Sequence, residues 1–412
     1  MHLLVRPEHH ADESLESYLL RLSQENGFSS YTEMSSVLKL WMQSHDHDAG
    51  GAFPIELAMV NVYHANRSSS FRVRAFRLIE HLTEKRPLKL LELALIHSSA
   101  NFGSNIKAVH RNGVDIPKQF LRVNGIPVCP KCLQEKGYVR QVWHYQPYTG
   151  CHIHHCQLID HCPVCSAELD YRKNESIEVC ECGFHLRYSE CIEASIEQIQ
   201  LSQLIAGDLF KETQNPLLAT ANLSFRFGAL FWYYHRYQEQ QATDNDINQI
   251  LNSVIAYFSN WPANFFAELE QQIEHFYQFQ VKKINQTAFS EVFGSLLVDC
   301  SHLPMSDLSC NFILKTVIEF FVHQVEENPK SKKANIGDVL VSPQEAASLL
   351  STEIEQIYRL HQEGCISLAI KPSSEWHISA YMPIFYLREV IELRLARMHS
   401  QNDVYQTYLS AW

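Results

Sequence analysis

Eight cysteine and histidine residues between positions 129 and 182 fall into two groups of four. The first quartet is Cys129, Cys132, Cys151 and His154, and the second quartet is Cys162, Cys165, Cys180 and Cys182. A Cys-x-x-Cys pair lies on a tight turn that brings both sulfurs to about 2.3 Å from one ion, and a second pair roughly 15–20 residues later completes a tetrahedron. We therefore expect two metal sites, which constrain the fold of this stretch more than any other feature.

The residue types in the two quartets favour structural zinc. A structural zinc site has all four positions filled by protein, whereas a catalytic site keeps one position open for water. Seven thiolates and one imidazole fill two such sites, so we expect two structural Zn²⁺ ions. Each such ion contributes on the order of 10 kcal/mol to folding in peptides, so this stretch should depend on metal for its structure.

Further ligand-type residues leave the choice of donors open. Only one residue separates Cys180 from Cys182, where two are usual, so His185 is an alternative to either cysteine. Other candidates lie close by in the sequence: His144, His152, His155, Cys156 and His161.

The chain of 412 residues has a formal net charge of −12. This charge argues against broad coating of nucleic acid as the main role, although a local basic surface is compatible with it. The first residues lack the basic region and apolar core of a secretory signal, and no apolar run approaches ~18–20 residues. We therefore expect a soluble cytoplasmic protein with no membrane contact.

Helical periodicity marks the N-terminal region. Leu15, Tyr18, Leu19 and Leu22 follow the spacing of one helix face, and Asn26-Gly27 provides a stop. We expect a second helix near residues 31–41, a loop over 44–51 and a further helix over 87–97. A linker rich in Ser, Asn and Gly then leads to the cysteines.

Basic residues are concentrated between Asn61 and Leu90, where only Glu80 and Glu84 are acidic. This concentration of basic residues predicts a solvated helix face, and the alternative is a contact with RNA, DNA or an acidic protein partner. The basic residues are Arg67, Arg72, Arg74, Arg77, Lys85, Arg86 and Lys89.

The region from 192 to 325 has a helical pattern almost throughout. Its aromatic run, Phe225 to Tyr234, is typical of a buried helix. Residues 326–335 are rich in charged and polar residues, which indicates a solvated linker into a last small domain.

The last domain contains a predicted helix-turn-helix. Ser342-Pro-Gln-Glu345 is a capping box with proline at the first helical position, and a second helix follows and ends at Glu363-Gly364. A recognition helix should present Arg, Lys, Asn or Gln to bases. Three of the six outward positions of the second helix are acidic, so we expect a surface for protein interaction or dimerisation, with direct DNA contact as the alternative.

These parts predict a mainly α-helical protein with four domains. They are an N-terminal helical, helix-turn-helix-like domain (1–118) and a tandem zinc-finger module (119–192). A helical domain (193–330) and a C-terminal domain with a winged helix-turn-helix (331–412) follow.

The chain resembles the TniQ family of transposition proteins. The resemblance rests on Glu13-Ser-Leu-Glu-Ser-Tyr-Leu-Leu-Arg-Leu22, on Cys129-Pro-Lys-Cys132 with Trp143, and on Cys151-His-Ile-His154 leading through Leu158-Ile159 to Cys162-Pro-Val-Cys165. Its length and its terminal helix-turn-helix make it most similar to the TniQ of type I-F CRISPR-associated transposons.

The resemblance implies a bacterial adaptor that carries out no chemistry. Such proteins form a homodimer, bind the crRNA-processing subunit and adjacent backbone subunit of a Cascade–crRNA complex, and recruit the TnsC ATPase and then the transposase. Target DNA is reached through Cascade, because base pairing reads the sequence. The alternative is a TnsD-like, sequence-specific DNA-binding selector. A zinc hydrolase is disfavoured, since the sequence contains no His-Glu-x-x-His motif.

Overall fold

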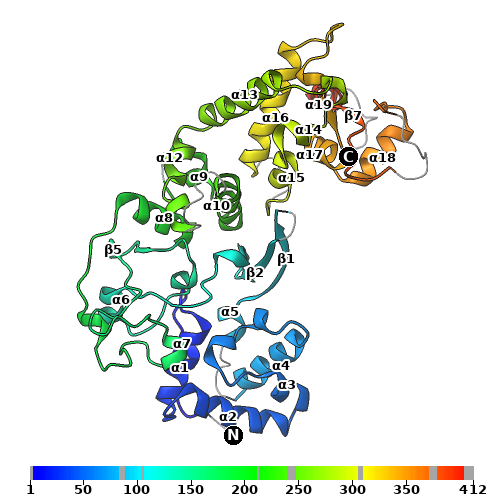
Figure 1. Cartoon of the computed structure of the whole chain (residues 1–412). Coiled ribbons are helices and arrows are strands. Elements are labelled where there is room, and N and C mark those ends of the chain that lie inside the picture. The colour runs from blue at the N-terminus through cyan, green and yellow to red at the C-terminus, as the bar shows by residue number, and fades with distance from the viewer. Residues whose placement is uncertain are drawn as a thin grey trace. The chain divides into compact units, whose positions relative to one another are not determined.

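The computed structural model describes residues 3–82, 89–103, 106–210, 213–238, 247–304, 310–370 and 378–402, with side chains described to residue 397. These residues are mainly helical, as expected (Figure 1). The chain divides into two compact units. Unit 1 comprises Met1–Asn101, Ile106–Glu212 and Arg226–Ile255, and unit 2 comprises Phe102–Asn105, Thr213–Phe225 and Ala256–Trp412. The four predicted domains divide the chain more finely and stay a prediction.

Unit 1 begins with the helices α1 (Leu15–Glu25), α2 (Tyr31–Gln43), α3 (His47–Ala52) and α4 (Ser69–Glu80). Ser14 caps α1 by accepting a hydrogen bond from the Ser17 amide. The predicted apolar face is confirmed, because Leu15, Tyr18, Leu19 and Leu22 are all buried. Two short 3₁₀ helices, η1 (Leu57–Met59) and η2 (Val62–His64), connect α3 to α4.

The prediction of a loop over 44–51 was wrong, because α3 forms there. The Asp46 side chain accepts a hydrogen bond from the Ala49 amide and so caps this helix. A side chain at Gly50 would place its Cβ 2.7 Å from the backbone nitrogen of Gln43. The glycines that suggested a loop therefore allow α3 to pack closely against α2.

The helix predicted over 87–97 was also wrong in extent. One turn, α5 (Leu90–Leu93), is followed by a three-stranded sheet in the order β1 (Ile96–Phe102), β2 (Ile106–Arg111) and β3 (Val114–Pro117). Strands β2 and β3 pair in antiparallel register, with Ala108 opposite Pro117. The turn between them is Asn112-Gly113, both with positive φ, which is a hairpin signal that the sequence analysis missed.

The cysteine-rich stretch contains little regular structure. Its elements are η3 (Lys118–Phe120), α6 (Pro130–Glu135), η4 (Gln141–His144), β4 (Gly150–Cys151), β5 (Cys156–Gln157), α7 (Tyr171–Asn174) and η5 (Leu186–Tyr188). Strands β4 and β5 form an antiparallel pair of two residues each. Such short elements bury few backbone hydrogen bonds, so other cross-links must hold this region together.

Helices predominate after the cysteines, as predicted. They are α8 (Ile196–Ala206), α9 (Pro216–Ala219), α10 (Leu223–Tyr237), α11 (Ile247–Leu251) and α12 (Val254–Ser259). A capping box of Ser195 and Gln198 starts α8, and Gly207 ends it in the left-handed conformation. The expected buried helix is confirmed in α10, where Phe225, Phe227 and Trp232 are buried.

Unit 2 continues with α13 (Ala263–Gln278), η6 (Ile284–Gln286), α14 (Phe289–Phe293), α15 (Leu296–Ser301) and α16 (Phe312–Glu327). Its C-terminal part consists of η7 (Ile336–Asp338), β6 (Leu340–Val341), α17 (Pro343–Leu350), α18 (Ile354–Gln362), β7 (Phe385–Tyr386) and α19 (Leu387–Asn402). The side chain of Phe321 in α16 packs edge-on against those of Phe289 and Phe293.

The predicted helix pair is present as α17 and α18. Ser342 and Glu345 form the capping box at the start of α17, and Ile357 and Leu360 of α18 are buried. Strand β7 pairs with β6, while residues 371–377, within the predicted wing, lie outside the described part of the chain. Among the described residues, no helix is both long and apolar enough to cross a membrane.

Candidate metal centres and the network beside them

The structure brings the first quartet together around one point. Cys129 caps α6, with Pro130 at the first helical position, and its sulfur lies 3.5 Å from the Cys132 amide nitrogen. Cys151 ends β4, and His154 lies in the turn before β5, where His155 adopts a left-handed conformation with φ of 52°. The Cys129–Cys132 turn, called the first knuckle below, thus faces the turn that contains His154.

The spacing within the first quartet fits a tetrahedral ion. The His154 Nδ1 atom lies 3.5 Å from the Cys129 sulfur, 3.3 Å from that of Cys132 and 3.6 Å from that of Cys151. The sulfurs of Cys132 and Cys151 are 3.7 Å apart. Four donors at zinc–ligand distances of 2.0 to 2.3 Å would be separated by about 3.3–3.8 Å, so the residues present fit a bound metal.

The second quartet joins a knuckle to a hairpin turn. Sulfur–sulfur distances are 3.7 Å between Cys162 and Cys182 and 3.6 Å between Cys165 and Cys180. Gly183, with φ of 87°, closes the turn by donating its amide hydrogen to the Cys180 carbonyl. All four ligand atoms lie within 4.8 Å of one another, so this group also has the geometry to hold a metal ion.

The remaining candidate ligands have other neighbours. His185 packs edge-on against the ring of Tyr188, whereas the sulfurs of both Cys180 and Cys182 belong to the second quartet. The closest of the others is Cys156, a buried residue whose sulfur lies 3.5 Å from that of Cys129. His144, His152 and His161 are within hydrogen-bond distance of Tyr171, Tyr148 and Asp160, respectively, and His155 is exposed.

Packing the thiols of the first quartet together lowers the pKa of one of them, Cys151, and raises the pKa of Cys129 and Cys132. Hydrogen bonds from Cys129 and Cys132 lower the pKa of the Cys151 thiol, because they stabilise its thiolate. On the other side of His154, Nε2 lies 3.0 Å from a carboxylate oxygen of Glu135. A carboxylate in this position orients a metal-binding imidazole and fixes its tautomer. The sequence analysis missed Glu135, which lies on α6 three residues after Cys132.

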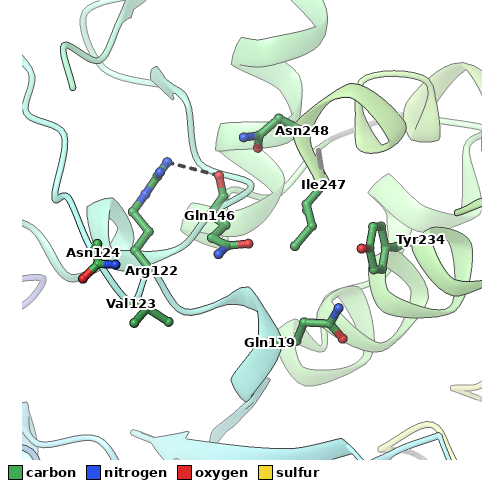
Figure 2. A pocket seen from close by; sticks show the side chains of 8 residues that line it. All are labelled: Gln119, Arg122, Val123, Asn124, Gln146, Tyr234, Ile247 and Asn248. Atoms are coloured by element: carbon green, nitrogen blue, oxygen red, sulfur yellow. Dashed lines mark hydrogen bonds between the residues drawn. The ribbon is translucent and has the colours of Figure 1, made fainter. Parts of the chain in front are cut away.

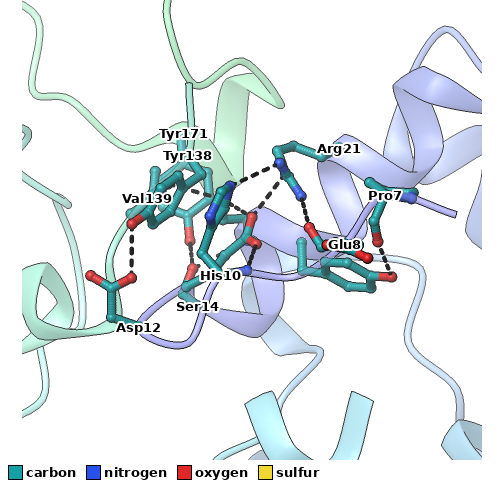
Figure 3. A network of polar contacts seen from close by, with 12 residues as sticks. Pro7, Glu8, His10, Asp12, Ser14, Arg21, Tyr138, Val139 and Tyr171 are labelled. Carbon is teal, nitrogen blue, oxygen red and sulfur yellow. Dashed lines mark hydrogen bonds and ion pairs between the residues drawn. The ribbon is translucent and has the colours of Figure 1, made fainter. Parts of the chain in front are cut away.

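The start of α1 is attached to the segment that follows the first knuckle (Figure 3). The Ser14 amide donates to the Val139 carbonyl at 3.0 Å, and the Val139 amide donates to the Ser17 hydroxyl at 2.9 Å. Asp12 accepts a hydrogen bond from the Tyr138 hydroxyl at 2.8 Å and forms an ion pair with Arg140. These side-chain bonds extend the isolated antiparallel β-bridge between Glu13 and Arg140.

Glu13 is the buried centre of this attachment. Its carboxylate accepts hydrogen bonds from the Ser17 hydroxyl and the His10 amide and forms an ion pair with Arg21 at 3.0 Å. Burial raises the pKa of Glu13, and the positive charge of Arg21 opposes this effect. The Glu13 carbonyl also accepts a hydrogen bond from Arg111. The Glu-Ser-Leu-Glu-Ser motif thus anchors α1 to the residues after the first knuckle.

The loop of the second quartet also reaches the N-terminal helices. The hydroxyl groups of Tyr171 and Ser14 are 2.8 Å apart. The Tyr171 hydroxyl also lies 3.0 Å from Nε2 of His144. Burial holds the pKa of His144 well below its ordinary value, so this imidazole is neutral. Glu175 accepts hydrogen bonds from the amide and hydroxyl groups of Thr32 in the first turn of α2. The segment after the first quartet is therefore connected to the start of α1, and the loop of the second quartet to the starts of both α1 and α2.

The basic segment is only partly a solvated face. Arg72 is buried and donates hydrogen bonds to the carbonyls of Ala52, Met59 and Asn61, so its predicted exposure was wrong. Arg74 pairs with Asp46. Arg67 and Arg77 are exposed, Lys89 pairs with Glu92, and Lys85 and Arg86 lie outside the described residues.

The fold and the two quartets define a mainly helical protein with two groups of four residues that could each hold a metal ion. Residues 4–158 match the family model described as TniQ, so this part of the chain is similar to that family. This match includes the α1 motif and the first quartet, and the second quartet follows it. No curated protein matches the chain. This similarity points to a protein associated with transposition.

Proposed function

We propose that this chain is a non-enzymatic targeting adaptor of an RNA-guided, type I-F CRISPR-associated transposon in the bacterial cytoplasm. As a homodimer, it binds a Cascade–crRNA complex at the crRNA-processing subunit and the adjacent backbone subunit. It then recruits the TnsC ATPase, which brings the transposase, and it reaches target DNA only through Cascade. The TniQ match supports the link to transposition, and the partners are inferred from the family resemblance.

The metal sites contribute structure to this function, and we propose that both hold Zn²⁺. Cys129, Cys132, Cys151 and His154 would bind one ion, and Cys162, Cys165, Cys180 and Cys182 the other. Four protein donors complete the tetrahedron that zinc prefers and leave no position for water. Zinc bound in this way supplies cross-links, and the residues themselves hold α6, the β4–β5 turn and the hairpin at Gly183 in place.

The observation that favours an adaptor over a DNA reader is the outward face of α18. Glu353, Glu355 and Glu363 are exposed there, beside the exposed Arg359. A carboxylate near a DNA phosphate is repelled, and only a basic or amide side chain can read most base edges at short range. The α18 face therefore suits a basic protein surface better than a major groove.

Co-purification tests this proposal. The zinc-loaded chain and its cognate Cascade–crRNA complex are mixed and separated by size-exclusion chromatography, and we expect them to elute together. A triple variant, Glu353→Gln with Glu355→Gln and Glu363→Gln, asks whether the α18 face takes part. Its control, with the same change in charge at exposed positions of unit 2, is Glu270→Gln with Glu274→Gln and Glu326→Gln. If the unmodified chain does not associate with Cascade, the proposal is wrong.

A TnsD-like DNA-binding selector is the second candidate, because α17 and α18 do form a helix-turn-helix. A gel shift with the attachment-site duplex separates the two functions. The adaptor should bind it weakly, with affinity that falls steeply as salt is added, since only phosphate contacts are available. Sequence-specific binding that survives competitor DNA would favour the selector.

A further inference from the structure

Two largely exposed segments of unit 2 combine lysines with apolar side chains. One follows the end of α13 and comprises residues 279–283, and the other follows the end of α16 and comprises residues 328–335. Neither contains an acidic residue, although the whole chain has a net charge of −12. We call the two segments together the lysine surface. The lysines of the second segment were predicted to belong to a solvated linker.

The fold brings these two segments to one place in unit 2. η6 packs against η7, and Ala288 forms a parallel β-bridge with Leu340 just after these two turns. The Leu340 amide also donates a hydrogen bond to the Thr287 carbonyl at 2.9 Å, and Tyr277 lies beside the backbone of Ile336. Because the chain runs in the same direction through both turns, the segments that lead into them lie at the same end.

Most lysines of this surface have no partner of opposite charge. Lys282 is the exception, since it forms an ion pair with Glu291 at 2.9 Å. The others are exposed and make no ion pair within the part of the chain that the structure describes: Lys283, Lys330, Lys332 and Lys333. Their charges are available to an anionic ligand.

The acidic side chains nearest to them in the sequence are mostly engaged elsewhere. Asp338 pairs with Arg388 at 3.2 Å, and a carboxylate oxygen of Glu327 lies 3.3 Å from Nε2 of His323. Glu326 remains exposed at the end of α16, and the lysines outnumber it. The local charge is therefore opposite in sign to that of the whole chain.

The loop 328–335 has a defined shape although it is exposed. The side-chain amide of Asn328 donates to the Gln324 carbonyl at 2.9 Å, and that of Asn335 donates to the Pro329 carbonyl at 3.1 Å. These bonds fix both ends of the loop, so its lysines are presented together and less conformational entropy is lost on binding.

Two side chains of the first segment add apolar surface beside the lysines. Phe279 is 67% exposed and Val281 is 96% exposed. The ring of His275, one helical turn earlier, lies 4.7 Å from that of Phe279 and supports it. Exposed apolar groups that are rimmed by charged residues mark sites of interaction, so the ligand has an apolar part as well as negative charge.

From this geometry we propose that the lysine surface binds a single-stranded nucleic acid, with phosphates near the lysines and a base stacked on Phe279. Proteins that bind single strands combine positive charge along the backbone with aromatic side chains on which bases stack. A lysine ammonium contacts a phosphate as a point charge and lacks the planar pair of donors that reads a base edge. Binding is therefore independent of sequence.

The exposed ring distinguishes a single strand from the other anionic partners. A duplex matches the charge, but the faces of its bases are stacked on one another and are not open to Phe279. An acidic peptide also matches the charge and leaves Phe279 without a flat partner. The inference concerns the chain alone, so it stands or falls separately from the proposed binding to Cascade.

Fluorescence anisotropy tests the inference with the full-length, zinc-loaded chain. The probes are a fluorescein-labelled single-stranded RNA of mixed sequence, the equivalent single-stranded DNA and the equivalent DNA duplex. Unlabelled poly-glutamate and unlabelled single strand serve as competitors at equal charge. Circular dichroism and metal content establish that each variant is folded.

Three sets of variants separate charge, stacking and location. The first replaces Lys330, Lys332 and Lys333 by glutamine, and its control makes the same change at the exposed Lys107, Lys136 and Lys315. Phe279→Leu removes the ring and stays apolar, whereas Phe279→Tyr keeps the ring. Gln146→Glu adds a negative charge in a polar cavity of about 590 Å³ on unit 1, the other hollow in which a base could lie (Figure 2).

We expect the lysine variant to weaken strand binding and to lower the slope of log K against log salt by about 2, since each phosphate contact contributes ~0.7. Phe279→Leu should weaken binding at least about fivefold, the effect of losing one stacked base. The control lysine variant, Phe279→Tyr and Gln146→Glu should bind like the unmodified chain. Stronger binding of one of the two labelled strands would assign the surface to RNA or to DNA.

Several results would overturn the proposal. They are no binding of either strand, equal effects of the lysine variant and its control, and full affinity in Phe279→Leu. Displacement by poly-glutamate as effective as that by the single strand would assign the surface to an acidic protein. Loss of binding in Gln146→Glu would place the strand in the cavity of unit 1. If the triple lysine variant does not fold, Lys283→Gln with Lys330→Gln replaces it, and the same outcomes apply.

Discussion

Replacing Cys129 by serine should remove one metal ion and detach the start of α1. Serine is also a good N-cap residue, so the cap of α6 is kept and the substitution isolates the loss of a metal ligand. The three remaining donors of the first quartet would be left around an incomplete tetrahedron. A structural zinc contributes on the order of 10 kcal/mol in peptides, comparable to the whole stability of a domain at about 5–15 kcal/mol.

The hydrogen-bond pattern predicts which part of the fold loses stability first when a metal ligand is removed. Residues 138–141 follow the first knuckle directly and hold Asp12 and Ser14, so amide hydrogen exchange should accelerate first at the start of α1. Cys162→Ser should accelerate exchange at the start of α2 as well as that of α1, because the second quartet's loop contacts Thr32 through Glu175 and Ser14 through Tyr171. Native mass spectrometry should find one ion in each variant.

Cys191→Ser is the matched control, because this thiol is near the first quartet in the fold but is not one of its four donors. It should keep both ions and the exchange pattern of the unmodified chain. The reasoning fails if Cys129→Ser still binds two ions, or if it loses one while exchange at the start of α1 stays slow.

Three other changes test the energetics of the fold. Burial raises the pKa of Glu16, one of whose oxygens has no hydrogen-bond partner among the described residues. Because a raised pKa in the folded state makes stability fall as the pH rises through that pKa, Glu16→Gln should raise the free energy of unfolding at pH 7. Urea unfolding should show this increase, and a smaller one at lower pH. Ser342→Ala should lower the melting temperature through loss of about 1 kcal/mol of capping, while Ser331→Ala, in the exposed linker, should not. Asp12→Asn should lower stability by about 1 kcal/mol, because it removes the ion pair with Arg140, and a double-mutant cycle with Arg140→Gln should show coupling.

The sequence predicted best those features whose cause is local. The spacing of Cys129 and Cys132 requires a knuckle, and the spacing of Leu15 and Leu22 requires a helix face. The capping box at Ser342 likewise acts within four residues. In each case, the interacting atoms belong to neighbours in the chain, so one sequence contains the whole pattern.

The remaining features depend on partners that are distant in the sequence. Gly50 looked like part of a loop because its reason, the close approach of Gln43, appears only when α2 and α3 are packed. The link from Ser14 to Tyr171 joins residues that no local pattern relates, and the same is true of the buried position of Arg72. The hairpin at Asn112-Gly113 differs, since its signal was local and was overlooked.

The claim on which the adaptor function depends most is that both metal sites are closed by protein donors. X-ray absorption at the zinc edge of the purified chain tests it directly, together with the metal content. Two zinc ions per chain, with seven sulfur and one nitrogen donors between them, are expected from the two quartets. A single ion, or an oxygen donor in the place of one of these eight, would contradict the account and reopen the possibility of a catalytic metal.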